Sequence, residues 1–269
     1  MLKQLREGQY FGVINHQSSF NGINITDTDY THEYVDWHCH ENPYFTFLLQ
    51  GKLVEENKKE SYTLSQGSLL FHNWQDYHRN IKPPEFTRGA HIEINRSWLA
   101  KIGISLDEIE GSLKINNPII KNLAFQILLE SKSADNYNQA SIELLLLELL
   151  STVRQSTVNK SKEKPKWFKR LGELIYENHD SKISIKSISS ELGIHPVHLS
   201  RTFHKHYRAS FGQYCREIRL NRAINYIILK KHNLTDIAYL THYYDQSHMT
   251  DTFKKRFKTT PKEVSRTIG

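Results

Sequence analysis

The chain has 269 residues, a formal net charge of +7 and two cysteines, Cys39 and Cys215, that lie far apart in the sequence. This composition argues against a disulfide-stapled secreted domain and favours a reducing compartment. The first residues lack the apolar core of a signal peptide, and the strongest apolar run, within residues 144–150, is interrupted by Glu148 and too short to cross a bilayer. We therefore expect a cytoplasmic protein with no membrane partner.

The charge is distributed unevenly along the chain. Residues 1–159 carry 14 Lys and Arg against 19 Asp and Glu, a net charge of −5, whereas residues 165–269 carry 19 against 9, a net charge of +10. An anionic half followed by a cationic half predicts two domains, of which the second binds a polyanion. A basic surface that is merely solvated is the alternative.

Residues 10–95 are predicted to form a β domain. Apolar and polar stretches alternate there at roughly ten-residue spacing and are separated by turns, which is typical of a sandwich or a small barrel. The predicted strands are residues 44–49, 52–54, 61–64, 68–71 and 90–94.

This β region is similar to a cupin-type barrel. The similarity rests on the pair His38 and His40 before a strand, on turns at Gly51 and Gly67, and on His78. Three neutral imidazoles at these positions suit Zn or Fe. The resemblance also implies a carboxylate a few residues after the pair in metal-binding cupins, but Tyr44 and Phe45 stand there.

We therefore expect ordinary barrel histidines and no cofactor, with a metal site as the alternative. A small-molecule pocket inside the barrel is the favoured interpretation, although no residue identifies its ligand. The candidate ligand-binding residues are His38, His40, Tyr44, Trp74 and His78.

Two helices are predicted after the β region, at residues 119–130 and 139–153. The second helix is so apolar that it is expected to bury more than one face. It either packs only against the barrel or also pairs with a second copy, and we favour a homodimer. The candidate dimerisation residues are Ile142, Leu145, Leu146, Leu149 and Val153.

The predicted organisation is a sensor and dimerisation domain over residues 1–155, a linker over 156–166 and a helical domain over 167–269. The linker is charged, poor in apolar residues and closed by Pro165.

Residues 185–207 predict a helix-turn-helix unit. Ser184 suits the N-cap of its first helix, Gly193 suits the positive φ that ends that helix, and Pro196 falls in the first turn of the next. The second helix, residues 196–207, is the candidate recognition helix.

A second unit is predicted over residues 235–257, with Thr235 as N-cap. It repeats the first unit: Thr202, Phe203 and Lys205 recur fifty residues later as Thr252, Phe253 and Lys255. A helix over residues 211–230, about 30 Å long, separates the units. Successive major-groove segments on one side of a duplex lie ~34 Å apart, so both recognition helices can enter the same DNA.

Several side chains of these helices are expected to face DNA. Arg201 can donate two hydrogen bonds to guanine O6 and N7, whereas Lys205 is expected to meet phosphates. The alternative is that Arg201 is only a solvent-exposed charge on the helix surface and contacts no DNA. The candidate DNA-binding residues are Val197, His198, Ser200, Arg201, His204, Lys205, Gln246, Ser247, His248, Thr250, Asp251, Lys254, Lys255 and Arg256.

Residues 167–266 closely resemble the DNA-binding domain of the AraC/XylS family of bacterial transcription regulators. The shared motifs are Leu199-Ser-Arg-x-Phe203, Ser210-Phe211, Arg219-Leu-x-x-Ala223, Ile237-Ala238, Asp245-Gln-Ser-His248, Phe253-Lys-Lys255 and Thr260-Pro261. The resemblance implies seven helices, two recognition helices on one duplex face and promoter binding that changes transcription.

The sequence departs from this family pattern at five positions. Arg208, His242 and Lys258 stand where the family usually has Gly, so those turns are expected to be rearranged or strained. Met249 replaces a usual Phe. Asp251 stands where the family commonly has the equivalent of Arg201, and a carboxylate cannot donate to guanine.

The sequence thus predicts an α+β protein in which a cupin-like barrel with following helices precedes an all-α domain with two helix-turn-helix units. The expected function is sequence-specific regulation of transcription, without catalysis. The expected partners are double-stranded promoter DNA, an unidentified small-molecule effector, a second copy of the chain and, for an activator, RNA polymerase. A metal-dependent cupin enzyme tethered to nucleic acid and a non-specific architectural DNA-binding protein are the alternatives.

Overall fold

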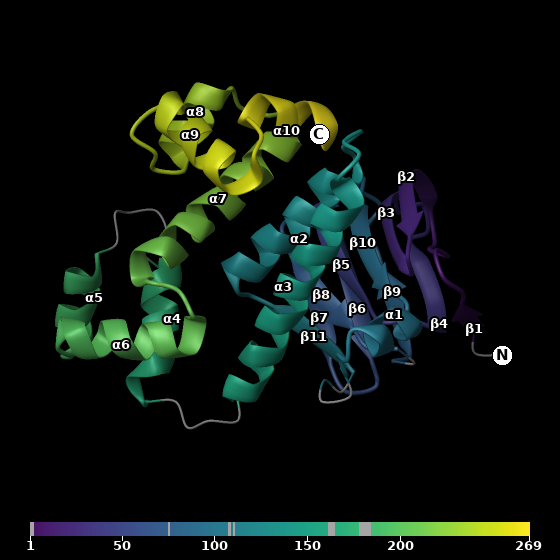
Figure 1. Cartoon of the computed structure of the whole chain (residues 1–269), viewed down its shortest axis with the longest axis horizontal. Coiled ribbons are helices and arrows are strands. Elements are labelled where there is room, and N and C mark those ends of the chain that lie inside the picture. The colour runs from purple at the N-terminus through teal and green to yellow at the C-terminus, as the bar shows by residue number, and fades with distance from the viewer. Residues whose placement is uncertain (1–2, 75, 107–108, 110, 161–164, 178–183) are drawn as a thin grey trace. The chain divides into compact units, whose positions relative to one another are not determined.

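The computed structural model describes residues 3–74, 76–106, 109, 111–160, 165–177 and 184–269 (Figure 1). Its contacts divide the chain into two compact units, residues 1–149 and 150–269, called the β unit and the helical unit below. Among the helices that the structure describes, none has the length and apolar character needed to cross a membrane.

Two sheets form the β unit. The five-stranded sheet has the order β1-β4-β9-β6-β7 and the six-stranded sheet has the order β11-β8-β5-β10-β3-β2. The strands are β1 (Lys3–Leu5), β2 (Val13–Phe20), β3 (Ile23–Asp29), β4 (Tyr34–His40), β5 (Tyr44–Gln50), β6 (Lys52–Asn57), β7 (Ser61–Ser65), β8 (Leu69–His72), β9 (His78–Ile81), β10 (Arg88–Ile94) and β11 (Ser112–Ile115). All described strand pairs are antiparallel except β1 with β4.

An apolar cluster joins the two sheets. Leu48 and Leu70 of the six-stranded sheet pack with residues of β6 and β7, namely Leu53, Tyr62 and Leu64. The sheets therefore face each other across a shared interior, as in a cupin-like barrel.

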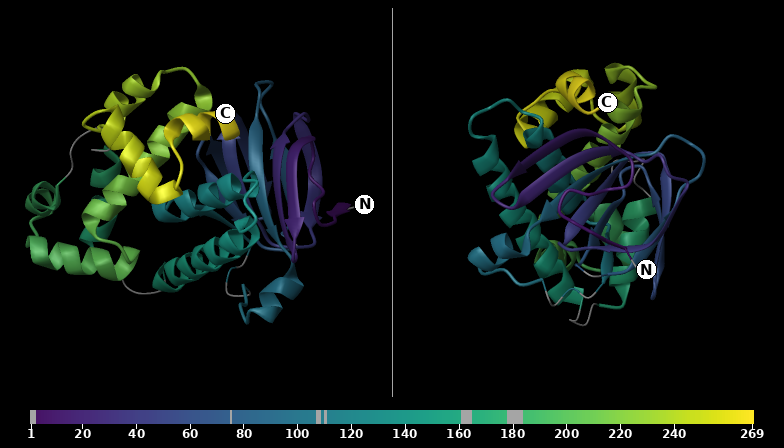
Figure 2. Two further views of the ribbon diagram at one scale, coloured as in Figure 1. Left: turned by 45° about the horizontal axis from the view of Figure 1, so that its top comes forward. Right: turned by 90° about the vertical axis from the view of Figure 1, so that its right-hand side faces the viewer.

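Strand β5 shows how sequence alternation positions the interior. Side chains alternate between the two faces of a strand, so Tyr44 and Thr46 line a cavity inside the β unit while Phe47 faces outward. Phe47 meets Phe125 of helix α2 (Pro118–Ser131), with ring centroids 6.1 Å apart. Because α2 covers this outer face (Figure 2), β5 is buried on both sides and reads as a nearly continuous apolar run.

Helices α1 (Arg96–Lys101) and α3 (Asn138–Lys160) complete the first half of the chain. Helix α3 is longer than predicted and includes residues 156–160, which were expected to be linker. Nothing in residues 154–160 breaks a helix, since neither Pro nor Gly occurs there. The predicted linker residues 161–164 lie outside the described residues.

The predicted dimerisation stripe faces the protein's own interior. Ile142, Leu146, Leu149 and Val153 are buried within the single chain, and Leu145 is partly buried. Four of the five side chains therefore have no surface to offer a second copy. Leu144, which was not among them, is exposed.

Seven helices form the described part of the chain from residue 165 onward, as the sequence predicted. They are α4 (Trp167–Glu177), α5 (Ile185–Leu192), α6 (Pro196–Tyr207), α7 (Phe211–Leu229), α8 (Leu234–Leu240), α9 (Gln246–Phe257) and α10 (Pro261–Thr267). Helix α7 contacts α6, α8 and α10, and it connects the α5–α6 pair with the α8–α9 pair (Figure 1). Its 19 residues make a rod of roughly 28 Å.

Side-chain caps begin these helices. Ser184 forms a capping box with Ser187, and Gly193 ends α5 with a φ of 64°. The prediction of Thr235 as an N-cap is wrong, because the Asn233 side chain accepts the backbone N–H of Asp236 at 2.9 Å. Helix α8 therefore begins one residue before Thr235.

Candidate DNA interface and ligand cavity

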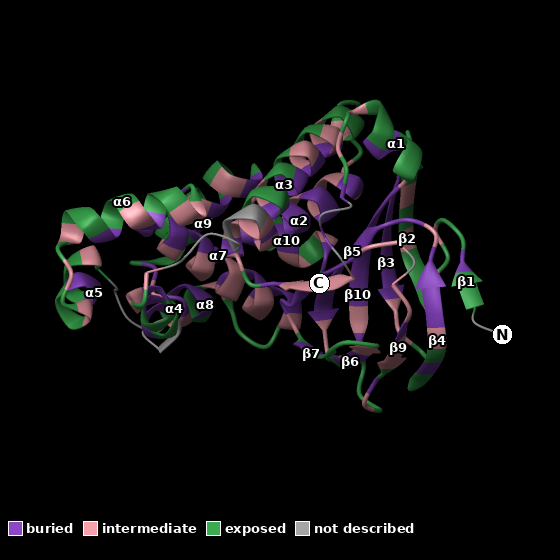
Figure 3. Ribbon diagram, turned by 90° about the horizontal axis from the view of Figure 1, so that it is seen from below, coloured by how far each residue is buried: buried purple, intermediate pink, exposed green. Residues whose placement is uncertain are grey.

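Helix α6 buries one face and exposes the others. Leu199 and Phe203 are fully buried, and the Phe203 ring lies 5.3 Å from those of Phe211 and Tyr214 of α7, measured between centroids. All the predicted DNA-facing residues of α6 are exposed (Figure 3), namely Val197, His198, Ser200, Arg201, His204 and Lys205. The core of the helical unit thus holds α6 in place, while the face of α6 that is predicted to contact DNA is exposed to solvent.

Helix α9 repeats this arrangement with Met249, Phe253 and Phe257 buried. The predicted DNA-facing residues that are exposed are Gln246, Ser247, His248, Asp251, Lys254 and Lys255. Thr250 is half-buried and donates its hydroxyl hydrogen to the Gln246 carbonyl at 2.9 Å.

Arg256 was expected to contact a DNA phosphate, but its side chain is engaged within the protein. Its Nε donates to Glu217 Oε2 of α7 at 3.4 Å, and its side chain is largely covered. This contact ties α9 to the central helix, which gives Arg256 a structural role.

The two helix-turn-helix units share backbone conformation at the positions where the family pattern has Gly. His242, in the turn of the second unit, has a φ of 57°, close to the 64° of Gly193 in the first. Arg208 and Lys258, directly after α6 and α9, have φ values of 53° and 59°. The turns are therefore not rearranged: the non-glycine residues adopt the left-handed conformation, which carries steric strain.

The β unit encloses a cavity of about 50 Å³. Of the predicted ligand-binding residues, His38, His40, Tyr44 and His78 line it. Trp74 does not: it is half-buried and lies under the Arg96 guanidinium, which is 3.7 Å from its ring centroid. This distance is that of a cation–π contact.

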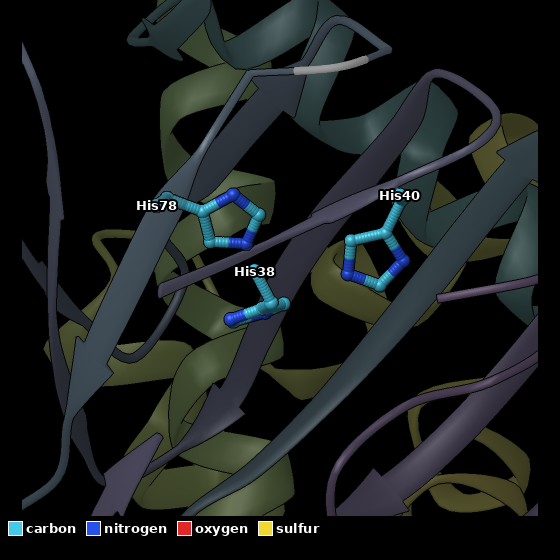
Figure 4. A group of neighbouring side chains, drawn as sticks. All are labelled: His38, His40 and His78. Carbon is cyan, nitrogen blue, oxygen red and sulfur yellow. The ribbon is translucent and has the colours of Figure 1, made fainter. Parts of the chain in front are cut away.

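Three imidazoles converge in this cavity (Figure 4). His38 and His40 are alternate residues of β4 and so project from one face, and His38 lies directly opposite His78 of β9. Their possible ligand atoms lie within 4.8 Å of one another. Among the described residues a second such group, Glu55, His72 and His78, shares His78 with the first.

These histidines are held neutral by their surroundings. Burial lowers the pKa of His78 to about 3. Burial, with smaller effects from His78 and His38, places the pKa of His40 well below its usual value, and burial also lowers the pKa of His38. Neutral imidazoles keep a nitrogen lone pair that can accept a hydrogen bond or bind a metal.

Three further buried residues of this interior were not predicted from the sequence: Glu55, His72 and His91. Burial raises the pKa of Glu55 to about 8, so it is largely protonated at neutral pH. His72 Nδ1 lies 3.2 Å from Glu55 Oε1. The available signal was alternation: Glu55 lies two residues after Leu53, on the same face of β6.

The comparisons with known proteins agree with the paired helix-turn-helix units. Residues 188–267 match a family described as a helix-turn-helix domain. The virulence regulon transcriptional activator VirF of Yersinia enterocolitica is 25% identical, covering 81% of this chain and 86% of that protein. The transcriptional activator RhaS of Klebsiella pneumoniae is 22% identical, covering 84% and 86%.

Among solved structures, apo ToxT K231A from Vibrio cholerae is similar at 13% identity and a TM-score of 0.41, covering 93% of this chain and 99% of that one. The matched domain and the relatives that span both halves of the chain are those of transcription regulators. The chain is therefore similar to transcription regulators of the AraC/XylS type, with the helix-turn-helix match at residues 188–267.

Proposed function

We propose that this protein binds promoter DNA sequence-specifically through α6 and α9 and regulates transcription under the control of a small ligand in the β unit. The observation that carries the proposal is the repeated unit: two helices of equal length, each buried on its apolar face and exposed on a basic one, flank a rod of roughly 28 Å. Adjacent major-groove segments lie ~34 Å apart, which suits this spacing.

Base contacts are assigned to the N-terminal half of each recognition helix and phosphate contacts to the C-terminal half. Arg201, on the exposed face of α6, suits bidentate recognition of guanine. Lys205, Lys254 and Lys255 suit phosphates, which fix position without reading sequence.

The control of this activity is assigned to the cavity of the β unit. Its lining combines apolar and aromatic side chains, among them Phe11, Tyr44 and Leu53, with buried polar groups that can orient a ligand, as small-molecule sites do. A homodimer that aligns two helical units on operator half-sites, and contact with RNA polymerase if the protein activates, complete the proposal.

To test this proposal, the purified full chain is used to select the sequences that it binds from a pool of random DNA. Binding to the selected operator is then measured in competition with random DNA at fixed salt. We expect specific binding about 10³-fold or more tighter than non-specific binding. Equal affinity for both DNAs would instead identify a non-specific architectural protein.

A further inference from the structure

The turn of the second helix-turn-helix unit contains one residue more than the turn of the first. Gly193 and His242 hold equivalent places, because both have a positive φ and the residue after each donates its N–H to the carbonyl five residues earlier. The N-cap of α6, His195, follows Gly193 by two residues, whereas the N-cap of α9, Asp245, follows His242 by three. The extra residue, directly before the N-cap of α9, is Tyr244.

The Tyr244 side chain stands in solvent although its backbone is held in place. It is 88% exposed, more than any other large hydrophobic residue that the structure describes. Its neighbour Tyr243 is buried and anchors the turn, with its ring centroid 5.4 Å from that of His248. The backbone N–H of Tyr244 donates to His248 Nδ1 at 3.3 Å, which ties the turn to α9.

Tyr244 lies where a helix-turn-helix unit meets the edge of the major groove. The first helix of such a unit crosses the DNA backbone, and the N-terminal residues of the second contact base edges. Tyr244 lies between these two regions, because it follows α8 and precedes Gln246 and Ser247, the first residues of α9. A side chain at this point reaches the sugars and phosphates that border the groove.

The N-terminal end of α9 has no cation with which to hold a phosphate. Residues 244–250 contain neither Lys nor Arg, and the basic residues of α9 lie in its last turn. The carboxylate of Asp245 caps the helix, since its Oδ1 accepts the backbone N–H of His248 at 2.7 Å. A neutral donor must therefore make any phosphate contact here, and the tyrosine hydroxyl is one of the donors that proteins use for this purpose.

We propose that Tyr244 contacts the DNA backbone beside the part of the operator that α9 reads. Its hydroxyl donates a hydrogen bond to a phosphate oxygen, and its ring packs against the adjacent deoxyribose. Hydrogen bonds to charged acceptors are stronger than those between neutral groups. The contact holds the N-terminal end of α9 at the groove without reading sequence. This role of Tyr244 rests on the DNA binding proposed above.

A neutral contact of this kind differs from a lysine contact in its response to salt. A lysine that binds a phosphate releases counterions, so its loss lowers the slope of log affinity against log salt. The hydroxyl of Tyr244 bears no charge and releases none. Its loss should therefore lower the affinity for DNA at every salt concentration and leave the slope unchanged.

The test compares the full chain with Tyr244→Phe, which removes only the hydroxyl. Fluorescence anisotropy is measured on the selected operator and on a random duplex over a series of salt concentrations. We expect binding about tenfold weaker on both duplexes, the lower end for a hydrogen bond to a charged group. Tyr244→Ala also removes the ring and should bind more weakly still. Tyr137, 77% exposed in the β unit, provides the matched control, and Tyr137→Phe should bind like the unmutated chain.

A second measurement identifies the acceptor on the DNA. A methylphosphonate, which replaces one charged phosphate oxygen by a methyl group, is placed in turn at each phosphate that borders the α9 part of the operator. At one of these positions it should weaken binding of the unmutated chain and have little further effect on Tyr244→Phe. Such non-additivity marks two groups in direct contact.

The proposal is overturned if both Tyr244 variants bind like the unmutated chain, if the salt slope of Tyr244→Phe falls, or if no phosphate is coupled to Tyr244. Failure of the proposed function gives a different result. Equal affinity of the unmutated chain for the operator and the random duplex would remove sequence-specific binding, while the loss caused by Tyr244→Phe would still be measured on either duplex. A chain that bound neither duplex would overturn both proposals.

Discussion

Arg201 and Asp251 occupy the same position, the sixth of twelve residues, in helices α6 and α9. Both side chains are exposed. A guanidinium donates two hydrogen bonds to guanine, whereas a carboxylate only accepts and can at most read cytosine N4. The two recognition helices therefore present opposite chemistry at equivalent positions, and α6 is expected to carry more of the base specificity.

Arg201→Ala is predicted to weaken operator binding by about 1–3 kcal/mol and to relax specificity at one base pair. Asp251→Ala, the matched change in α9, should have a smaller effect. Fluorescence anisotropy on the selected operator and on its single-base variants measures both. The ranking is wrong if Arg201→Ala binds as well as the unmutated chain while changes at Thr250 or Gln246 abolish binding.

Lys205→Ala is predicted to weaken binding to all DNA sequences alike. A phosphate contact releases counterions, so its loss should reduce the slope of log affinity against log salt by about 1. Lys58→Ala removes the same charge from an exposed position in the β unit and provides the control. A change in sequence preference without a change in slope would show that Lys205 reads bases.

Much of the helical unit could be predicted because its signals are local. Ser184, Gly193 and Pro196 each act within one or two turns of their own helix, and the structure places them at the predicted cap, turn and first turn. Thr235 failed as a cap because Asn233 is equally suited and lies two residues earlier. Sequence spacing alone does not show which of two suitable residues caps the helix.

The interior of the β unit could be predicted only in part, because it depends on strand pairing. His38 and His40 share a face through local alternation, and this was visible in the sequence. Glu55 reaches His72 only because β6 and β8 lie in opposing sheets, which no local pattern specifies. The same limit applies to Trp74, which packs under the Arg96 guanidinium and does not line the cavity.

Lys258→Gly is predicted to raise the free energy of unfolding by about 0.5–1 kcal/mol. A non-glycine residue in the left-handed region costs ~1–2 kcal/mol, and the greater freedom of Gly in the unfolded chain offsets about half of that. Urea unfolding measures the change in midpoint. Lys254→Gly, inside α9, should lower stability by about 1 kcal/mol; equal effects of the two would refute strain at Lys258.

The acid stability of the β unit is predicted to depend on Asp27, a buried residue of β3. Arg88 of β10 donates from Nε to Asp27 Oδ1 at 2.7 Å, and Lys132, at the end of α2, lies 2.5 Å from Oδ2. Burial alone would raise the pKa of Asp27, but the hydrogen bonds and charges of these two cations outweigh it, so the pKa is lowered.

A carboxyl group whose pKa is lower in the folded than in the unfolded chain stabilises the fold fully at pH values above its pKa in the unfolded chain. The contribution of Asp27 is therefore complete at neutral pH, begins to fall near its ordinary pKa of 3.8 and is lost as the pH drops through the lower folded value. Asp27→Asn removes the anion that Arg88 and Lys132 share, although Arg88 keeps Asp29 at 4.0 Å, and should cost about 3–5 kcal/mol at pH 7. Because the variant lacks this titration, its stability should fall less steeply below pH ~4, as urea unfolding across a pH series would measure. Parallel pH profiles for the two proteins would show that Asp27 does not govern acid unfolding.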